Sequence, residues 1–201
     1  MNICRLLSLA LAFQLLVPGA APGGLRPPRA AQFLDAAAAL ENPGVQFDRQ
    51  YRRIAYPMGD VPRGVGVCAD VVVRAYRGIG IDLQKQVHED MARHFALYPH
   101  IWGLRAPDPN IDQRRVLNLR VFFARHGATL KVTSDARDYK PGDLVTWNLD
   151  PSGSTPHIGI VMPRRTWDGA RPLILHNMGG GQVYADILFA YKITGHYRYG
   201  I

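Results

Sequence analysis

The chain has few cysteines, an excess of basic over acidic residues, and no internal repeat. Its 201 residues include two cysteines, Cys4 and Cys68, which excludes a disulfide scaffold and a CxxC-type zinc site. Acidic residues number 16 against 24 basic ones, so the net charge is +8 and a basic face can attract an anionic envelope polymer or a membrane surface. No nucleic-acid recognition motif accompanies this charge, and a nucleic-acid partner is therefore disfavoured.

The longest apolar run near the N-terminus is too short to cross a bilayer and has the layout of a secretory signal peptide. Arg5 precedes the apolar residues 6–17, and small residues follow them. The run has about 12 residues, whereas a membrane span needs about 20. We expect residues 1–23 to be a signal peptide and residues 24–201 to form one domain, exported to the periplasm or cell envelope without a stable membrane span. The alternative for the run is a buried N-terminal helix.

Helix signals come first in the chain and strand signals come later. Apolar positions at helical spacing, with Pro, Asp or Gly at the ends, predict helices over residues 29–41, 68–77, 82–98 and 111–126. Short β-rich segments follow and predict strands over residues 129–133, 143–149, 157–162, 172–177, 182–184 and 191–199. This segregation predicts an α+β fold with an antiparallel sheet and argues against a doubly wound parallel sheet.

Cys68 is the cysteine that remains once the expected signal peptide is removed, and it lies where a helix is expected to begin. The preceding residues 64–67 contain two glycines, which permit a tight approach turn. Unpaired N–H groups at a helix N-terminus stabilise a thiolate, so we expect the pKa of Cys68 to be lowered and the thiol to be a nucleophile. The alternative is a buried thiol with no chemical role. Asp70 and Arg74 are four residues apart, which predicts an ion pair on the helix surface.

A thiolate nucleophile needs a base, and His157 is the best candidate among the seven histidines. It opens an apolar strand, and Gly159 shares its face two residues later, leaving room for another backbone or a substrate. The next strand ends in His176 and Asn177, which must point to opposite faces, so one of them can reach the His157 ring. The sequence therefore predicts a Cys–His–His or a Cys–His–Asn set.

Three segments of the second half resemble the NlpC/P60 cell-wall peptidases, which belong to the papain-like cysteine peptidases. The segments are Pro141-Gly142-Asp143-Leu144-Val145, Pro156-His157-Ile158-Gly159-Ile160-Val161 and Leu175-His176. The resemblance implies a papain-like fold of N-terminal helices packed on an antiparallel sheet or half-barrel. It also implies Cys68 as nucleophile, His157 as base, His176 as the residue that orients the His157 ring, and Tyr56 as a residue lining the substrate cleft.

More narrowly, the stretch from about Tyr56 to Tyr199 resembles the DUF1287 family of exported bacterial proteins. The segments that carry this likeness are residues 66–72, 87–91, 110–112, 176–177 and 195–199. Together the resemblances imply an exported cysteine hydrolase that cleaves an amide bond in peptidoglycan stem peptides, and we expect no cofactor and no metal ion. The alternatives are an amidase or acyltransferase acting on another envelope substrate, and a non-catalytic envelope-binding protein of the same fold.

Overall fold

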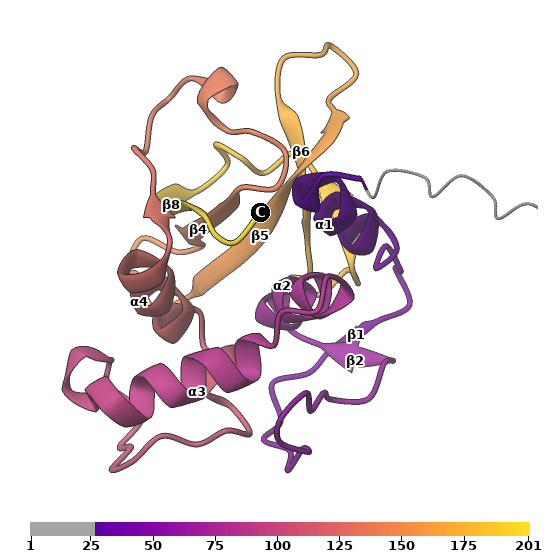
Figure 1. The fold of residues 1–201 in the computed structure, drawn as a ribbon. Coiled ribbons are helices and arrows are strands. Elements are labelled where there is room, and N and C mark those ends of the chain that lie inside the picture. Colours follow the sequence, from indigo (N-terminus) through magenta and orange to yellow (C-terminus); the bar gives the residue numbers. More distant parts are fainter. Residues whose placement is uncertain (1–26) are drawn as a thin grey trace, which may run out of the picture.

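Six strands form an antiparallel sheet, with helices packed against one of its faces (Figure 1). The computed structural model describes residues 27–201, so the expected signal peptide of residues 1–23 lies outside the described residues. In spatial order the strands are β3 (Ala128–Thr129), β8 (Lys192–Arg198), β4 (Leu144–Asn148), β5 (Pro156–Arg165), β6 (Pro172–His176) and β7 (Val183–Ala185). Every neighbouring pair in this sheet is antiparallel. The predicted α+β class with an antiparallel sheet is therefore confirmed.

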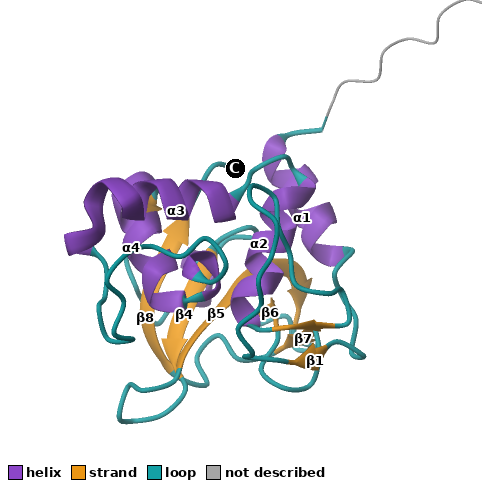
Figure 2. Ribbon diagram, turned by 90° about the horizontal axis from the view of Figure 1, so that it is seen from below, coloured by secondary structure: helices purple, strands orange, loops and turns teal. Residues whose placement is uncertain are grey.

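The α-helices precede the sheet in the chain and lie together on one side of it (Figure 2). They are α1 (Arg29–Ala38), α2 (Cys68–Gly78), α3 (Leu83–His94) and α4 (Val116–His126). Three short 3-10 helices are η1 (Phe95–Leu97), η2 (Asp112–Arg114) and η3 (Ala136–Asp138). A separate parallel pair of strands, β1 (Gln46–Phe47) and β2 (Val65–Gly66), leads the chain into α2.

The helix predicted over residues 111–126 is divided in the structure. Residues 112–114 form η2, Arg115 has an extended backbone, and α4 begins at Val116. The prediction was wrong at this boundary because apolar spacing reports the buried face of α4 but not the break before it. The break places Arg115 in an irregular segment between η2 and α4.

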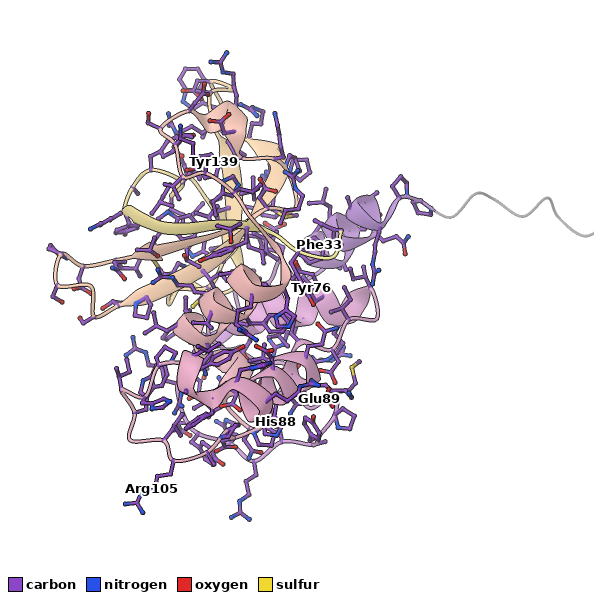
Figure 3. All side chains as sticks on the ribbon, turned by 60° about the vertical axis from the view of Figure 1, so that its left-hand side comes forward. Phe33, Tyr76, His88, Glu89, Arg105 and Tyr139 are labelled. Carbon is purple, nitrogen blue, oxygen red and sulfur yellow. The ribbon has the colours of Figure 1, made fainter. Side chains whose placement is uncertain are left out.

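Side-chain alternation along β5 separates two apolar clusters on the two faces of the sheet. Ile158 and Ile160 belong to the cluster shared with the helices, whereas Val161 belongs to the opposite cluster with Trp147. On the helix side the rings of Phe33 and Tyr76 pack with centroids 4.6 Å apart, where α1 meets α2. Figure 3 shows these two side chains next to each other, and Tyr139 at the opposite end of the molecule from α3.

Candidate active site

The thiol of Cys68 lies at the first residue of α2. Val67 before it has an extended backbone, and its N–H donates a 2.7 Å hydrogen bond to the carboxylate of Asp70. This contact satisfies one backbone donor at the helix end and fixes the turn that presents the thiol. The predicted start of the helix at the cysteine is confirmed. Cys68 is buried, with 6% of its surface exposed.

His157 and His176 contact each other between β5 and β6. Nε2 of His157 lies 3.1 Å from Nδ1 of His176, and the two rings meet edge to face. A Cβ at Gly159 would lie 2.4 Å from Cγ2 of Ile174 and 3.3 Å from Cβ of His176. The space that Gly159 leaves is therefore filled by the neighbouring strand, which brings His176 to the His157 ring.

Asn177 makes a different contact from His176, as strand alternation requires. Its side-chain amide donates a 3.2 Å hydrogen bond to the Gly66 carbonyl, and its oxygen accepts one from the Gly179 N–H. Asn177 is fully buried and holds the approach turn two residues before Cys68. Of the two candidates for the residue that contacts His157, the structure selects His176.

Cys68 and His157 line the same cavity, which has a volume of about 440 Å³. They approach it from different sides, because Cys68 belongs to the helix-side cluster while alternation places His157 on the opposite face at the start of β5. Among the hydrogen bonds of residues 27–201, none joins the Cys68 sulfur to the His157 ring. The backbone amides of Ile158, Ala69 and Cys68 itself act on the sulfur in the direction that favours the thiolate. Of the two ring nitrogens of His157, Nε2 is the one that contacts His176.

Burial dominates the electrostatics of all three groups. It raises the pKa of the Cys68 thiol to about 11, although the backbone amide of Ile158 opposes the shift. Burial, together with the charge of His176, lowers the pKa of His157 to about 3, and burial lowers the pKa of His176 to about 4. The expected lowering of the Cys68 pKa is therefore wrong, because desolvation outweighs the helix N-terminus. The directions of these shifts favour a neutral thiol and two neutral imidazoles in the resting site.

These shifts predict that the free energy of unfolding falls as the pH is lowered from about 6.5 to 4. The folded-state pKa values of His157 and His176 lie below the ordinary value of 6.5, so the unfolded chain binds more protons in this window and is favoured there. Each pKa unit corresponds to about 1.4 kcal/mol, so the loss amounts to a few kcal/mol. Urea unfolding at several pH values measures it. The double variant His157→Gln/His176→Gln should give a flatter profile than His100→Gln, which changes an exposed histidine; equal slopes would contradict the assignment.

Tyr56 is not brought together with Cys68. It is exposed and does not line the cavity, and its ring lies edge-on to His88 of α3 with centroids 5.3 Å apart. The implied role in lining the cleft therefore stays a prediction. The chain around it is held towards α3 because Gln84 bonds the Ala55 carbonyl and the Gly59 amide. The aromatic residues that line the cavity are Phe47 and Trp102.

Asp70 forms a buried ion pair with Arg114 of η2, at 2.9 Å. The predicted surface pair with Arg74 is wrong, since Arg74 pairs with Asp60. Arg114 also donates to the carbonyls of Asp48 and Gln50, so it links η2, the start of α2 and the segment that follows β1.

Sequence reasoning missed the arginines of the cavity wall. Arg49, Arg114 and Arg115 line it, and they come from segments that are irregular or 3-10 helical. The adjacent pair Arg114-Arg115 is visible in the sequence, but no spacing rule places it beside Cys68. Within residues 27–201, no group of three or more His, Cys, Asp or Glu side chains is arranged to hold a metal ion. In the same residues, no helix combines the length and apolar character that a membrane span requires.

Comparison with known families agrees with the narrower resemblance. The family model described as a domain of unknown function (DUF1287) matches residues 34–199. The chain belongs to the DUF1287 family. A relative in this comparison, the uncharacterized protein YijF of Escherichia coli (strain K12), is 49% identical over 153 residues, which cover 76% of this chain and 73% of that protein.

Solved structures similar to this DUF1287 protein carry NlpC/P60 names. NlpC1 from Trichomonas vaginalis has 13% identity and a TM-score of 0.45, covering 85% of this chain and 44% of that chain. A Staphylococcus aureus protein, described as similar to a lipoprotein of the NLP/P60 family, has 14% identity and a TM-score of 0.42, covering 85% of this chain and 41% of that chain. The chain thus spans less than half the length of these solved structures.

Proposed function

We propose that this DUF1287 protein is an exported cysteine hydrolase that cleaves an amide bond in peptidoglycan stem peptides. The observation that carries the proposal is the 3.1 Å contact between His157 and His176, beside a cavity whose wall includes Cys68 at a helix N-terminus. A nucleophile, a base and a residue that orients the base are the three parts that thiol catalysis requires. The apolar run near the N-terminus and the net charge of +8 support a substrate in the anionic cell envelope.

The neutral resting state defines the order of proton transfers. The mechanism requires the tautomer in which the His157 Nε2–H donates to Nδ1 of His176, because this arrangement leaves Nδ1 of His157 unprotonated. In the substrate complex, where the two groups must come within hydrogen-bond reach, that nitrogen accepts the thiol proton of Cys68 as the sulfur attacks the carbonyl carbon of the amide. The N–H of Cys68, the first residue of α2, is one of the helix donors without an intrahelical partner and stabilises the developing oxyanion.

Collapse of the tetrahedral adduct breaks the C–N bond. The His157 imidazolium returns its proton to the departing amine, and Cys68 is left as a thioester with the acyl part of the substrate. A water molecule then attacks the thioester while His157 accepts its proton. The products are a carboxylic acid, a free amine and the regenerated thiol. His176 stabilises the transient imidazolium and holds the ring orientation.

Incubation of the purified protein with peptidoglycan tests the proposal, with the released fragments identified by mass. The wild type and His100→Ala, an exposed histidine outside the cavity, should release fragments cut at an amide bond of the stem peptide. Cys68→Ala and His157→Ala should release none while keeping a cooperative thermal transition. Cleavage by Cys68→Ala equal to that of the wild type would overturn the assignment. Transfer of the acyl part to an added amine, without a free acid, would instead indicate an acyltransferase.

A further inference from the structure

The charged side chains that line the Cys68 cavity are all arginines. Arg49, Arg114 and Arg115 contribute to the wall, and no aspartate or glutamate does. Arg114 is neutralised by its buried ion pair with Asp70. Arg49 and Arg115 have no ion pair within 4.0 Å among the described residues, although the carboxylates of Asp112 and Asp108 act on Arg115 from a greater distance. Both arginines therefore contribute positive charge to the cavity wall.

Each of these two arginines packs on an aromatic ring of the cavity wall. The Arg115 guanidinium lies over the ring of Trp102 at 4.2 Å from the centroid, and that of Arg49 lies over Phe47 at 5.6 Å. Stacking uses the flat face of a guanidinium and leaves its N–H edge free for hydrogen bonds to an oxygen anion. The rings therefore orient the arginines without neutralising them.

Arg115 also carries a hydrogen-bond donor that the described residues do not satisfy. Its Nη1 atom is buried and has no hydrogen-bond partner among them. Burial lowers the pKa of Arg115, while the charges of Asp112 and Asp108 oppose the shift. An atom without accessible surface does not contact a ligand in the cavity, so Arg115 would bind one through the part of its side chain that lines the cavity wall.

We propose that Arg115, assisted by Arg49, binds an anionic oxygen group of the substrate beside Cys68, and that this group is a carboxylate. The inference rests on the proposed hydrolase function and names the substrate class: a peptide with a carboxylate close to the amide bond that Cys68 attacks. The fork of an arginine fits a carboxylate or a phosphate, and a peptide supplies the carboxylate. Leu149 and Met178 form apolar wall beside these charges and accept the aliphatic part of such a residue.

Cys68 itself can report the preference, because iodoacetate and iodoacetamide differ in charge and little in size. Alkylation rates are measured for both reagents from the mass of the peptide that contains Cys68. In the wild type, the ratio of the iodoacetate rate to the iodoacetamide rate should be about tenfold higher than the same ratio for free cysteine. A tenfold change corresponds to about 1.4 kcal/mol, which a single close charge pair can supply. The iodoacetamide rate corrects for any change in the pKa of the thiol.

Substitution of the arginines tests their individual contributions. Arg115→Gln should lower the ratio about tenfold, Arg49→Gln should lower it less, and Arg115→Lys should restore part of it. Arg105→Gln is the matched control, since Arg105 makes the same charge change, does not line the cavity and extends into solvent in Figure 3. A wild-type ratio equal to that of free cysteine, or equal ratios in Arg115→Gln and Arg105→Gln, would overturn the proposal.

A second measurement does not depend on thiol chemistry or on hydrolysis. Glutarate should raise the melting temperature of the wild type and of Cys68→Ala more than glutaramide does, and Arg115→Gln should remove the difference. Inorganic phosphate as effective as glutarate would assign the site to phosphate, and no difference between glutarate and glutaramide would overturn the site altogether. Stabilisation by glutarate without cleavage of peptidoglycan would keep the anion site and reject the proposed hydrolase.

Discussion

Replacement of Asp70 by asparagine should lower the free energy of unfolding by about 3 to 5 kcal/mol. Both carboxylate oxygens are in use: one accepts from Nε of Arg114, and the other accepts from Nη2 of Arg114 and the N–H of Val67. Asp70 has 3% and Arg114 has 9% of its surface exposed. The substitution removes the charge that compensates a buried guanidinium, and an uncompensated buried charge is among the most destabilising changes known for a single residue.

Urea unfolding monitored by tryptophan fluorescence measures the effect. Asp186→Asn is the matched control, because Asp186 pairs with Arg171 at the exposed surface, where an ion pair contributes about 0 to 1 kcal/mol. The double variant Asp70→Asn/Arg114→Met should be more stable than Asp70→Asn, since it no longer buries an unpaired charge. If Asp70→Asn and Asp186→Asn unfolded at the same urea concentration, the pair would have no structural importance.

The same substitution should also displace the functional groups. Arg114 joins α2 to the carbonyls of Asp48 and Gln50, and Arg49 lies between these two residues. Asp70 therefore connects the turn that presents Cys68 to the segment that carries Arg49. This connection explains why a carboxylate is placed in the first turn of a helix that is buried on nearly every side.

Local signals in the sequence were sufficient to predict the helix and the strand that carry Cys68 and His157. The two glycines before Cys68 and the apolar spacing after it predict the start of α2, and the alternation after His157 predicts β5; both are found. Strand alternation also predicts that His176 and Asn177 diverge, and they do. These features depend on neighbours within a few residues along the chain, and such neighbours are visible in a sequence.

Contacts between distant segments could not be predicted in this way. Spacing favoured Arg74 as the partner of Asp70, but the structure pairs Asp70 with Arg114, 44 residues away. The resemblance to the NlpC/P60 peptidases implied that Tyr56 lines the cleft, whereas its ring packs against His88 of α3. The prediction of a lowered pKa for Cys68 took account of the helix N-terminus but not of the burial that the tertiary fold imposes. In each case a non-local arrangement outweighed a local preference.

Removal of His176 should lower the turnover number of the proposed hydrolase by orders of magnitude, whereas removal of Asn177 should mainly lower stability. His176 contacts Nε2 of His157 and therefore decides which nitrogen of His157 carries the proton at rest. In serine proteases, loss of the residue that orients the histidine costs about 10⁴ in kcat through the wrong tautomer, and a loss of similar order is expected for His176→Ala. Asn177 bonds the Gly66 carbonyl, so Asn177→Ala loosens the turn before Cys68 and leaves the histidine pair in place.

The two variants are compared by kcat on stem-peptide fragments and by melting temperature. His176→Ala should lose kcat, and its melting temperature should fall to an extent similar to that of Asn177→Ala, because both changes truncate a buried side chain. His176→Gln should recover part of the activity, since its side-chain oxygen can accept the Nε2–H of His157 and restore the tautomer that leaves Nδ1 free. Asn177→Ala should lower the melting temperature by several degrees, because it removes a buried hydrogen bond. For a chain of this size, that shift corresponds to a loss of about 1 to 2 kcal/mol in the free energy of unfolding. The opposite pattern, with full activity in His176→Ala and a large loss of kcat in Asn177→Ala at an unchanged melting temperature, would transfer the orienting role to Asn177.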